Sequence, residues 1–345
     1  MRDTMGRKTV YNAITSDEKI AQINKKNMEL VNDFLDYMRS IDRAPTTIKN
    51  YRADLLVFFC WCLEHLDNKY FVDLTKREIA RFQSYALTEW GWSSNRTRNV
   101  KAVLSSLSNY IENILDDEIK GFKPIIRKIE DPVKQPAREK TVFSKTELTK
   151  LLDYLVDKKQ YQKACALALA IASGRRKSEL CRLKVSHFSD DNIIYNSLYK
   201  TPELIKTKGR GKGKFIPIYV VVDSFKKYFD LWMGERERLG IQSEWLLVGN
   251  KNPDGTYPPM NTSRLDSWAT TFTSIIGKPF YWHSLRHFFV SELQRAGIPD
   301  GVIQEIVNWE TADMVKLYSD LTADEQIGKY FGVDKGDVDS PLSKL

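Results

Sequence analysis

The sequence lacks the features that would place a chain in or across a membrane. No apolar run among its 345 residues approaches the roughly 20 residues that span a bilayer. The N-terminus, MRDTMGRKTVYNAITSDEK, lacks the apolar core of a secretory signal peptide. We therefore expect a cytoplasmic protein with no membrane partner.

Cysteine is scarce as well. Four cysteines are too few and too unevenly placed for a disulfide framework in a chain of this length. Cys60, Cys62 and His65 invite a zinc interpretation, but both cysteines fall within the apolar run LLVFFCWCLEHL and lack the usual two-residue spacer. The sequence therefore favours buried core cysteines over metal ligands.

Two kinds of catalytic machinery are also missing from the sequence. It contains no Gly-x-x-x-x-Gly-Lys-Ser/Thr loop for a nucleoside triphosphate. It contains no clustered carboxylates of the kind that a two-metal nuclease uses. We therefore expect no ATP, no metal and no other cofactor.

What the sequence does contain is a globular composition with excess positive charge. Apolar residues make up 42% of the chain and charged residues 28%, which is typical of a folded soluble protein. The length is sufficient for two domains of ordinary size. A net charge of +8 and a pI of about 9.0 favour a polyanionic partner.

The first part of the chain has helical periodicity throughout. Apolar residues recur at helical spacing over 17–39, 45–66 and 95–115, and a capping box of Thr75 and Glu78 opens a further helix. We expect a polar lead-in at 1–15, a helical domain over 16–122 and a basic linker over 123–142. That linker, with its prolines and many Lys and Arg residues, suits either a strap across a phosphate backbone or a solvated connection.

The second domain is predicted to span 143–334, followed by a tail at 335–345. It opens with a capping box of Ser144 and Glu147, and the run ACALALAIA predicts a central helix buried on all sides. Short strand-like runs follow in NIIYN, ELIKT and KFIPIYV, the last two joined by KGRGKG. Further helices are predicted at 222–238, 262–276, 283–296, 300–308 and 311–319. The expected fold class is mainly α with a small antiparallel β-sheet.

Two arginine-bearing segments could bind an anion. In SGRRKSEL, Ser173 and Gly174 break the buried helix, so the following cations are expected at the start of a new helix, where free backbone N–H groups also favour an anion. In HSLRH, His283 and Arg286 stand three positions apart and share one helix face, with His287 beside it. Because a guanidinium can hold two oxygens of one phosphate, the two segments together predict a phosphate site.

These segments resemble the tyrosine recombinases, also called the phage integrase family. The family's first box has the form Gly-x-Arg-x-Ser-Glu-Leu and its second the form His-x-Leu-Arg-His, and both are matched here, at 174–180 and 283–287. The segment PTTIKNYRADLLVFF also looks like the family's helical core-binding, SAM-like domain. The resemblance implies that domain followed by a mixed α/β catalytic domain, in a site-specific recombinase that cleaves DNA through a 3′-phosphotyrosyl intermediate.

The resemblance also implies roles for individual residues. Arg176 and Arg286 would grip the scissile phosphate, His283 would assist proton handling, and Tyr318 in MVKLYSD stands where the family places its nucleophile. The family's Leu-Gly-His reads Val307-Asn308-Trp309 here, so Trp309 either contacts phosphate through its indole N–H or only packs the helix of the nucleophile. Glu179 and His287 would support these residues.

The general acid is expected among the lysines of IKTKGRGKGKFIPI. A lysine there would protonate the leaving 5′ oxygen, a task that requires hydrogen-bond reach. Lys208 fits the family's hairpin best and Lys206 is the alternative. The remaining cations of the hairpin are expected to touch the DNA backbone, with DNA contacts predicted for Lys206, Arg210 and Lys212.

The resemblance further implies double-stranded DNA as partner, a homotetramer on two recombination sites and an optional accessory DNA-bending protein. In the helical domain, Arg96, Arg98 and Lys101 are candidate phosphate contacts, or else a solvated face.

An apolar patch in the tail, Ile327 to Val333, would dock on a neighbouring protomer or pack in cis. Only about 16 residues precede the helical domain, which favours a compact recombinase of a mobile element or phage. The rivals are a type IB topoisomerase and a non-catalytic DNA-binding regulator.

Overall fold

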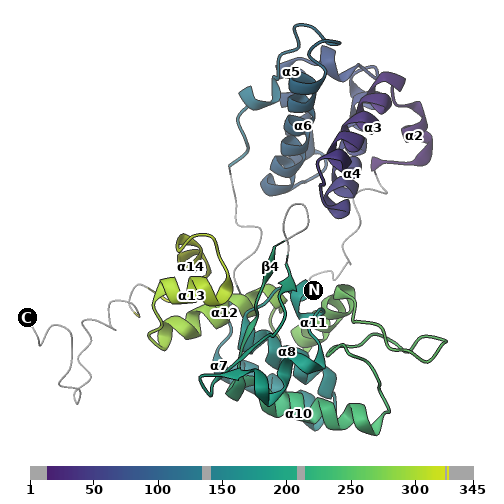
Figure 1. Ribbon diagram of the computed structural model, residues 1–345. Coiled ribbons are helices and arrows are strands. Elements are labelled where there is room, and N and C mark those ends of the chain that lie inside the picture. Colours follow the sequence, from purple (N-terminus) through teal and green to yellow (C-terminus); the bar gives the residue numbers. More distant parts are fainter. Residues whose placement is uncertain (1–13, 134–140, 208–213, 323–324, 326–345) are drawn as a thin grey trace, which may run out of the picture. The chain divides into compact units, whose positions relative to one another are not determined.

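The computed structural model describes residues 14–133, 141–207, 214–322 and 325 (Figure 1). The chain divides near residue 140 into two compact units, and each has its own hydrophobic core. The predicted fold class, mainly α with small antiparallel sheets, is confirmed.

None of the helices in these described ranges combines the length and the apolarity that crossing a membrane requires.

In its described residues the N-terminal unit contains helices and 3₁₀ turns but no strand. Helix α4, one of its two longest helices, is lined on its core side by aromatic residues, with Phe58 and Trp61 packed on Phe82 of α5. The helices and 3₁₀ turns of this unit are α2 (Asp17–Gln22), α3 (Lys25–Ser40), α4 (Pro45–His65), η1 (Phe71–Asp73), α5 (Lys76–Thr88), α6 (Ser94–Ile114) and η2 (Ile126–Lys128).

The cysteines of α4 are core residues, as the sequence favoured. Cys60 and Cys62 have no exposed surface, and burial raises the pKa of the Cys60 thiol to about 11 and that of Cys62 further. Among the residues that the structure describes, no group of three or more His, Cys, Asp and Glu side chains is placed to hold a metal ion.

The single helix predicted over 17–39 is wrong, because the chain breaks between α2 and α3. Ile23 leaves the helical conformation with ψ of 137°, and the side chain of Asn24 accepts a hydrogen bond from the backbone N–H of Lys26. The amide of Asn24 also bonds to Asn68, with its backbone N–H donating to Oδ1 at 2.8 Å. An N-cap inside an otherwise continuous apolar pattern therefore divides the helix.

The chain after α6 remains bound to the N-terminal unit for longer than the sequence indicated. Ile126 of η2 is buried, and Arg98 donates to the carbonyl of Pro132 at 3.0 Å. The ammonium of Lys101 binds the carbonyl of Ile129 and, at 2.8 Å, the carboxylate of Asp131. The first part of the linker predicted over 123–142 therefore contacts the N-terminal unit, and 134–140 lie outside the described residues.

The C-terminal unit is built around α8 (Tyr161–Ser173), the helix predicted from ACALALAIA. Residues 164–170 of this helix are almost completely buried, and α8 packs against α7, α10, α12 and β5. Small alanine side chains let neighbouring elements approach closely on every side. The helices of this unit are α7 (Lys145–Asp157), α8, α9 (Lys177–Leu180), α10 (Val222–Arg238), α11 (Thr262–Ile276), α12 (Trp282–Arg295), α13 (Asp300–Val307) and α14 (Asp313–Tyr318), with 3₁₀ turns η3 (Val185–Phe188) and η4 (Asp190–Asn192).

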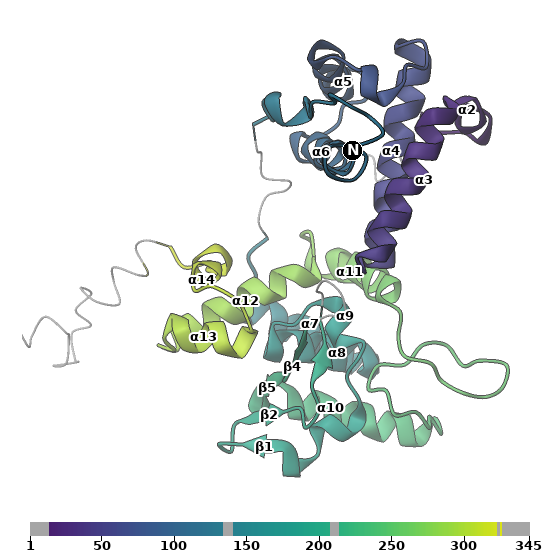
Figure 2. The same cartoon turned by 45° about the horizontal axis from the view of Figure 1, so that its top comes forward.

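The strands form two small antiparallel sheets, and Figure 2 shows the larger one beside α10. The predicted hairpin around KGRGKG is present, with Ile205 paired to Ile216. The run KFIPIYV forms two strands rather than one, because Pro217 has no N–H for a ladder. The strand Leu198–Lys200 was not predicted. The strands are β1 (Ile193–Ile194), β2 (Leu198–Lys200), β3 (Ile205–Lys206), β4 (Phe215–Ile216) and β5 (Tyr219–Val221).

Helix α12 connects the main core of this unit to a smaller one. Its residues Trp282 and Leu285 belong to the core around α8, whereas Phe289 and Val290 pack with α13 and α14. Helix α12 therefore links the C-terminal helices to the core around α8.

Gly174 occupies the junction between α8 and the segment that follows. It ends α8 in the left-handed conformation, with φ of +59°, and a Cβ at this position would lie 2.6 Å from Cδ1 of Phe289. Glycine is required here both by the backbone conformation and by the close approach of α12.

We expect Gly174→Ala to destabilise the C-terminal unit by about 3 kcal/mol, since the left-handed conformation and the steric clash both add cost. Gly277→Ala is the matched control, because Gly277 ends α11 with φ of +79° but has open space around its Cβ position. Its expected loss is about 1 kcal/mol. Calorimetric unfolding of the two full-length variants measures the difference, and equal losses would contradict it.

Candidate functional site

The first arginine of the site is held by a buried carboxylate. Arg176 is the N-cap of α9, and its backbone N–H donates to Oε2 of Glu179 at 3.1 Å. Nη1 of the same arginine donates to Oε1 of Glu179, also at 3.1 Å. Glu179 has no exposed surface, whereas the Arg176 side chain is 39% exposed. One carboxylate therefore orients the guanidinium and leaves part of it open to a ligand.

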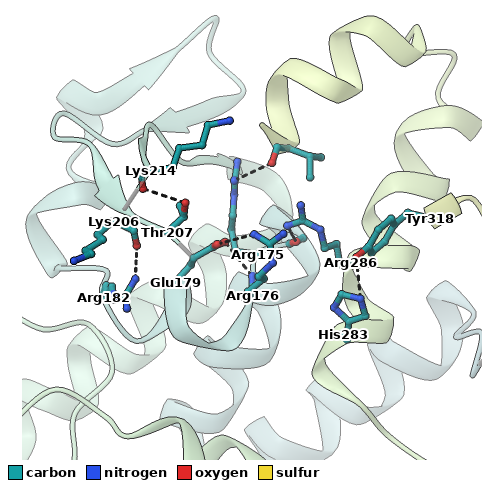
Figure 3. Close-up of polar contacts among 12 residues, drawn as sticks. Arg175, Arg176, Glu179, Arg182, Lys206, Thr207, Lys214, His283, Arg286 and Tyr318 are labelled. Atoms are coloured by element: carbon teal, nitrogen blue, oxygen red, sulfur yellow. Dashed lines mark hydrogen bonds and ion pairs between the residues drawn. The ribbon is translucent and has the colours of Figure 1, made fainter. Parts of the chain in front are cut away.

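The neighbours of Arg176 do not face the same way. Arg175 is buried and donates to the carbonyls of Ile306 and Val307, and Lys177 forms an ion pair with Asp266. The sequence predicted these three cations at the start of a new helix, and α9 does begin there, with Lys177 as its first residue. Only Arg176 lies with the residues described next (Figure 3).

The second arginine is buried and incompletely bonded. Arg286 is 1% exposed, and its Nη1 donates to the carbonyl of Gly174 at 3.1 Å. Its Nε and Nη2 have no hydrogen-bond partner among the described residues. Burial, and then the charges of Arg176 and Arg175, lower the pKa of Arg286 to about 10, so the guanidinium remains charged at neutral pH. Unsatisfied buried donors on a cation favour an incoming anion.

Tyr318 brings a phenol to these cations. It is the last residue of α14, and its Oη lies 3.0 Å from Nε2 of His283 (Figure 3). The guanidinium carbon of Arg286 lies 5.6 Å from the centre of the Tyr318 ring. The phenol thus meets an imidazole and a buried cation of α12, which lie 32 or more residues earlier in the chain.

His283 is placed to accept a proton from this phenol. Partial burial of the ring lowers the pKa of His283, and the charges of Arg286 and Arg176 lower it further. The imidazole is therefore neutral at pH 7, when one ring nitrogen has a free lone pair. A neutral imidazole at hydrogen-bond distance from a phenol is the arrangement of a general base.

His287 and Ser291 hold the chain next to the phenol. The His287 ring stacks on the Tyr318 ring at 4.5 Å between centres, and its Nδ1 lies 3.2 Å from the Tyr318 carbonyl. One turn further along α12, the Ser291 hydroxyl accepts from the backbone N–H of Asp320 at 2.8 Å. Three successive turns of α12, at 283, 287 and 291, therefore determine where Tyr318 lies.

Trp309 covers the same ring from another side. Its indole lies 4.8 Å from the Tyr318 ring and 4.9 Å from the Arg286 guanidinium carbon. The preceding Asn308 adopts the left-handed conformation, with φ of 58° and ψ of 57°, which asparagine tolerates better than other side-chain-bearing residues. This explains why asparagine can replace the glycine expected at 308. The indole N–H has no partner among the described residues, so packing and phosphate contact both remain compatible with the geometry.

The candidate lysines are only partly described. Lys206 is exposed, and Figure 3 shows its side chain directed away from Arg176, Arg286 and Tyr318. Arg182 donates to its backbone carbonyl. The remaining predicted cations of the hairpin, Lys208, Arg210 and Lys212, lie outside the described residues.

The three cations predicted in the N-terminal unit are all bonded within that unit. Arg96 forms a 2.7 Å ion pair with Asp54, and Arg98 lies 3.2 Å from the Asp131 carboxylate. Arg96 and Arg98 keep side-chain exposures of 27% and 35%, so their contact with phosphate stays a prediction. Lys101 is 8% exposed, which fits neither a phosphate contact nor a solvated face.

The sequence indicated the residues that meet at Tyr318, but it did not indicate the residues that hold them in place. Nothing in SGRRKSEL signalled that Arg175 is buried, and Ser291 was not singled out. The residue type was a signal at 308, because Asn and Gly are the residues that commonly end helices in the left-handed conformation.

Comparisons with known proteins identify relatives over most of the chain. Residues 141–325 match the family model "Phage integrase family", and residues 30–121 match "Phage integrase, N-terminal SAM-like domain". The SPbeta prophage-derived recombinase-like protein YomM of Bacillus subtilis (strain 168) is 29% identical over 256 residues, which cover 73% of this chain and 72% of that protein. The tyrosine recombinase XerD of Oceanobacillus iheyensis is 23% identical over 303 residues, 85% of this chain and 93% of that protein.

Solved structures with the same fold include two DNA complexes. A lambda integrase tetramer bound to a Holliday junction matches with a TM-score of 0.63 at 17% identity, over 85% of this chain and 77% of that chain. The XerH recombinase in a post-cleavage complex with its palindromic difH substrate matches with a TM-score of 0.60 at 20% identity, over 82% and 79%. At such identities the likeness establishes the fold.

The electrostatic environment of His283 can be tested by NMR titration. We expect its imidazole to titrate below 6.5, and Arg176→Gln to raise this pKa because a like charge is removed. With four histidines in the chain, His283→Gln assigns the resonance. Arg182→Gln, which removes an exposed arginine of the same unit, is the control and should leave the titration unchanged. A wild-type pKa at or above 6.5 would contradict the prediction.

Proposed function

Because the chain belongs to the phage integrase family, we propose that it is a site-specific DNA recombinase that cleaves and rejoins DNA through a 3′-phosphotyrosyl intermediate. The observation that carries this proposal is the 3.0 Å contact between the Tyr318 hydroxyl and His283, beside the buried guanidinium of Arg286. A phenol is a weak nucleophile at its ordinary pKa near 10, so it needs both a base and nearby cations.

In the proposed cleavage step, the Tyr318 oxygen attacks the scissile phosphorus. Its proton passes to His283, the bond between phosphorus and the 5′ oxygen breaks, and a lysine of the hairpin supplies a proton to that oxygen. Arg176 and Arg286 hold the non-bridging oxygens, where negative charge increases in the transition state. Attack by a 5′-hydroxyl on the phosphotyrosine reverses the step, so the bond energy is conserved.

The two arginines would contribute in different ways. Arg286 is already desolvated and retains two free donors, so little reorganisation is required when a phosphate arrives. Arg176 is partly exposed and is aligned by Glu179, so it can engage the phosphate from the open side. Trp309 has one indole N–H to offer where relatives usually have a histidine.

The proposed substrate is double-stranded DNA, and the proposed assembly is a homotetramer acting on two sites of a phage or mobile element. Support comes from the two family-model matches and from fold neighbours solved as DNA complexes, one of them a tetramer. The tail segment expected to dock on a neighbouring protomer, 327–333, lies outside the described residues. An accessory DNA-bending protein is a further partner that we propose for this reaction.

A non-catalytic regulator on the same scaffold is the alternative that the contact between Tyr318 and His283 argues against. A regulator needs a cationic surface for DNA but no phenol bonded to a neutral imidazole. A type IB topoisomerase would share the cleavage step and differ by relaxing supercoils as a monomer. The first experiment therefore tests cleavage, and the assembly state of the cleaved complex then separates recombinase from topoisomerase.

We expect the wild-type protein to form a covalent DNA adduct that Tyr318→Phe abolishes, because the substitution removes the attacking oxygen. Sheared DNA from the organism that carries the gene is incubated with the protein in EDTA, denatured in SDS, and the protein-bound fragments are sequenced. Tyr195→Phe, an 85% exposed tyrosine of the same unit, is the control and should retain full adduct formation. Specific DNA binding without any adduct would favour the regulator.

The identity of the general acid is tested with a modified leaving group. We expect Lys208→Ala to lower the cleavage rate at least 100-fold on normal DNA. A substrate with sulfur in place of the 5′ bridging oxygen should restore the rate, because a thiolate leaves without protonation. Lys206→Ala is the matched control, and a larger defect there than at Lys208, rescued by sulfur, would transfer the role to Lys206.

A further inference from the structure

We propose that Arg175 is a positioning residue of the active site, which fixes the end of α13 so that Trp309 is held against Arg286 and Tyr318. The cleavage part of this inference rests on the proposed function, whereas the effect on Trp309 does not. Arg175 occupies the variable position of the first box, and nothing in the sequence pattern gives it a role.

Arg175 is among the largest fully buried side chains of the described structure. It is 2% exposed, and burial, together with the neighbouring charge of Arg176, lowers its pKa to about 10, against the opposing effect of Glu179. It is still protonated at neutral pH. A buried cation is costly, so its presence requires acceptors that an apolar side chain would not satisfy.

Those acceptors are the last carbonyls of α13. Arg175 Nη1 donates to the carbonyl of Val307 at 3.3 Å, and Nη2 donates to that of Ile306. Figure 3 shows its side chain extending away from Tyr318 towards this helix. The contact spans more than 130 residues of sequence, and it places a positive charge at the negative end of the helix dipole.

Together with the backbone, Arg175 satisfies the whole C-terminus of α13. A helix leaves its last four carbonyls without partners inside the helix. The backbone N–H of Asn308 donates to the carbonyl of Glu305 at 3.1 Å, and that of Trp309 donates to the carbonyl of Gln304 at 3.0 Å. Arg175 supplies the donors for the remaining two. The chain can therefore turn through the left-handed Asn308 without leaving a buried carbonyl unpaired.

The turn at Asn308 determines where Trp309 lies. Trp309 follows directly and is 8% exposed, with its indole against Arg286 and Tyr318. The residues next to Arg175 act on the same site, because the Gly174 carbonyl accepts from Arg286 and Arg176 is bound to Glu179. Three consecutive residues thus connect the two arginines of the site with the tryptophan that covers the nucleophile.

The test compares Arg175→Met with Arg236→Met in the full-length protein. Methionine keeps an unbranched chain but removes both donors. Arg236 is the matched control, because it is also a buried arginine of this unit whose guanidinium donates to backbone carbonyls, those of Ser243, Trp245 and Leu246. A general loss of stability should appear in both variants, whereas loss of the Trp309 position should appear only in the first.

The first readout is the fluorine NMR spectrum of protein containing 5-fluorotryptophan, without DNA. Trp309→Phe assigns the resonance of Trp309. We expect Arg175→Met to shift or broaden this resonance, Arg236→Met to leave it in place, and Arg175→Lys to restore it in part. An unchanged Trp309 resonance in a folded Arg175→Met protein would overturn the inference, as would the same change in Arg236→Met.

The second readout is the rate of covalent adduct formation at saturating DNA. We expect Arg175→Met to lower this rate about 10- to 100-fold, the effect of misplacing a reacting group, with DNA affinity changed less than threefold. Arg175→Lys should recover part of the rate. If Arg175→Met does not fold, Arg175→Lys takes its place, with a smaller expected shift of the Trp309 resonance. An unchanged Trp309 resonance in Arg175→Lys would then overturn the inference. If the wild type forms no Tyr318-dependent adduct, the proposed function fails and the fluorine spectrum alone decides the role of Arg175.

Discussion

The charge balance around Glu179 is the constraint on which the C-terminal site depends. This fully buried carboxylate bonds to Arg176, and its charge also acts on Arg175 and Arg286. The single negative charge of Glu179 thus acts on three guanidinium groups. The site therefore has a net positive charge before any ligand binds. Such an arrangement costs stability in the free protein, but a phosphate that enters meets donors that need no rearrangement.

Helix ends and one continuous helix maintain this arrangement. The left-handed Gly174 exposes the carbonyl that binds Arg286, and the left-handed Asn308 directs Trp309 over the same guanidinium. Between them, α12 carries His283, Arg286, His287 and Ser291 on adjacent turns, and it is anchored in the core beside α8. The short segments around Gly174 and Asn308 are therefore held in place by contacts with α12, whose other face is buried in the core.

The sequence predicted what depends on local pattern. Helical periodicity located nearly all the helices, and the two arginine segments indicated an anion site because both residue types and spacing are local properties. The resemblance to a family selected Tyr318, and the structure adds that its hydroxyl meets His283. The hydrogen bonds of Arg175 and Arg286 to carbonyls more than 100 residues away have no local signature, so they could not be predicted. The strand at 198–200 was missed because three residues give too little alternation.

The burial of the cysteines has a consequence for the redox behaviour of the protein. All four thiols are buried, and their pKa values are raised, so almost no thiolate forms at neutral pH. Oxidants and alkylating reagents act on the thiolate, and the folded chain offers them little of it. The proposed nucleophile is a phenol, which follows no thiol redox equilibrium. The proposed strand cleavage therefore does not depend on the redox state of a cysteine.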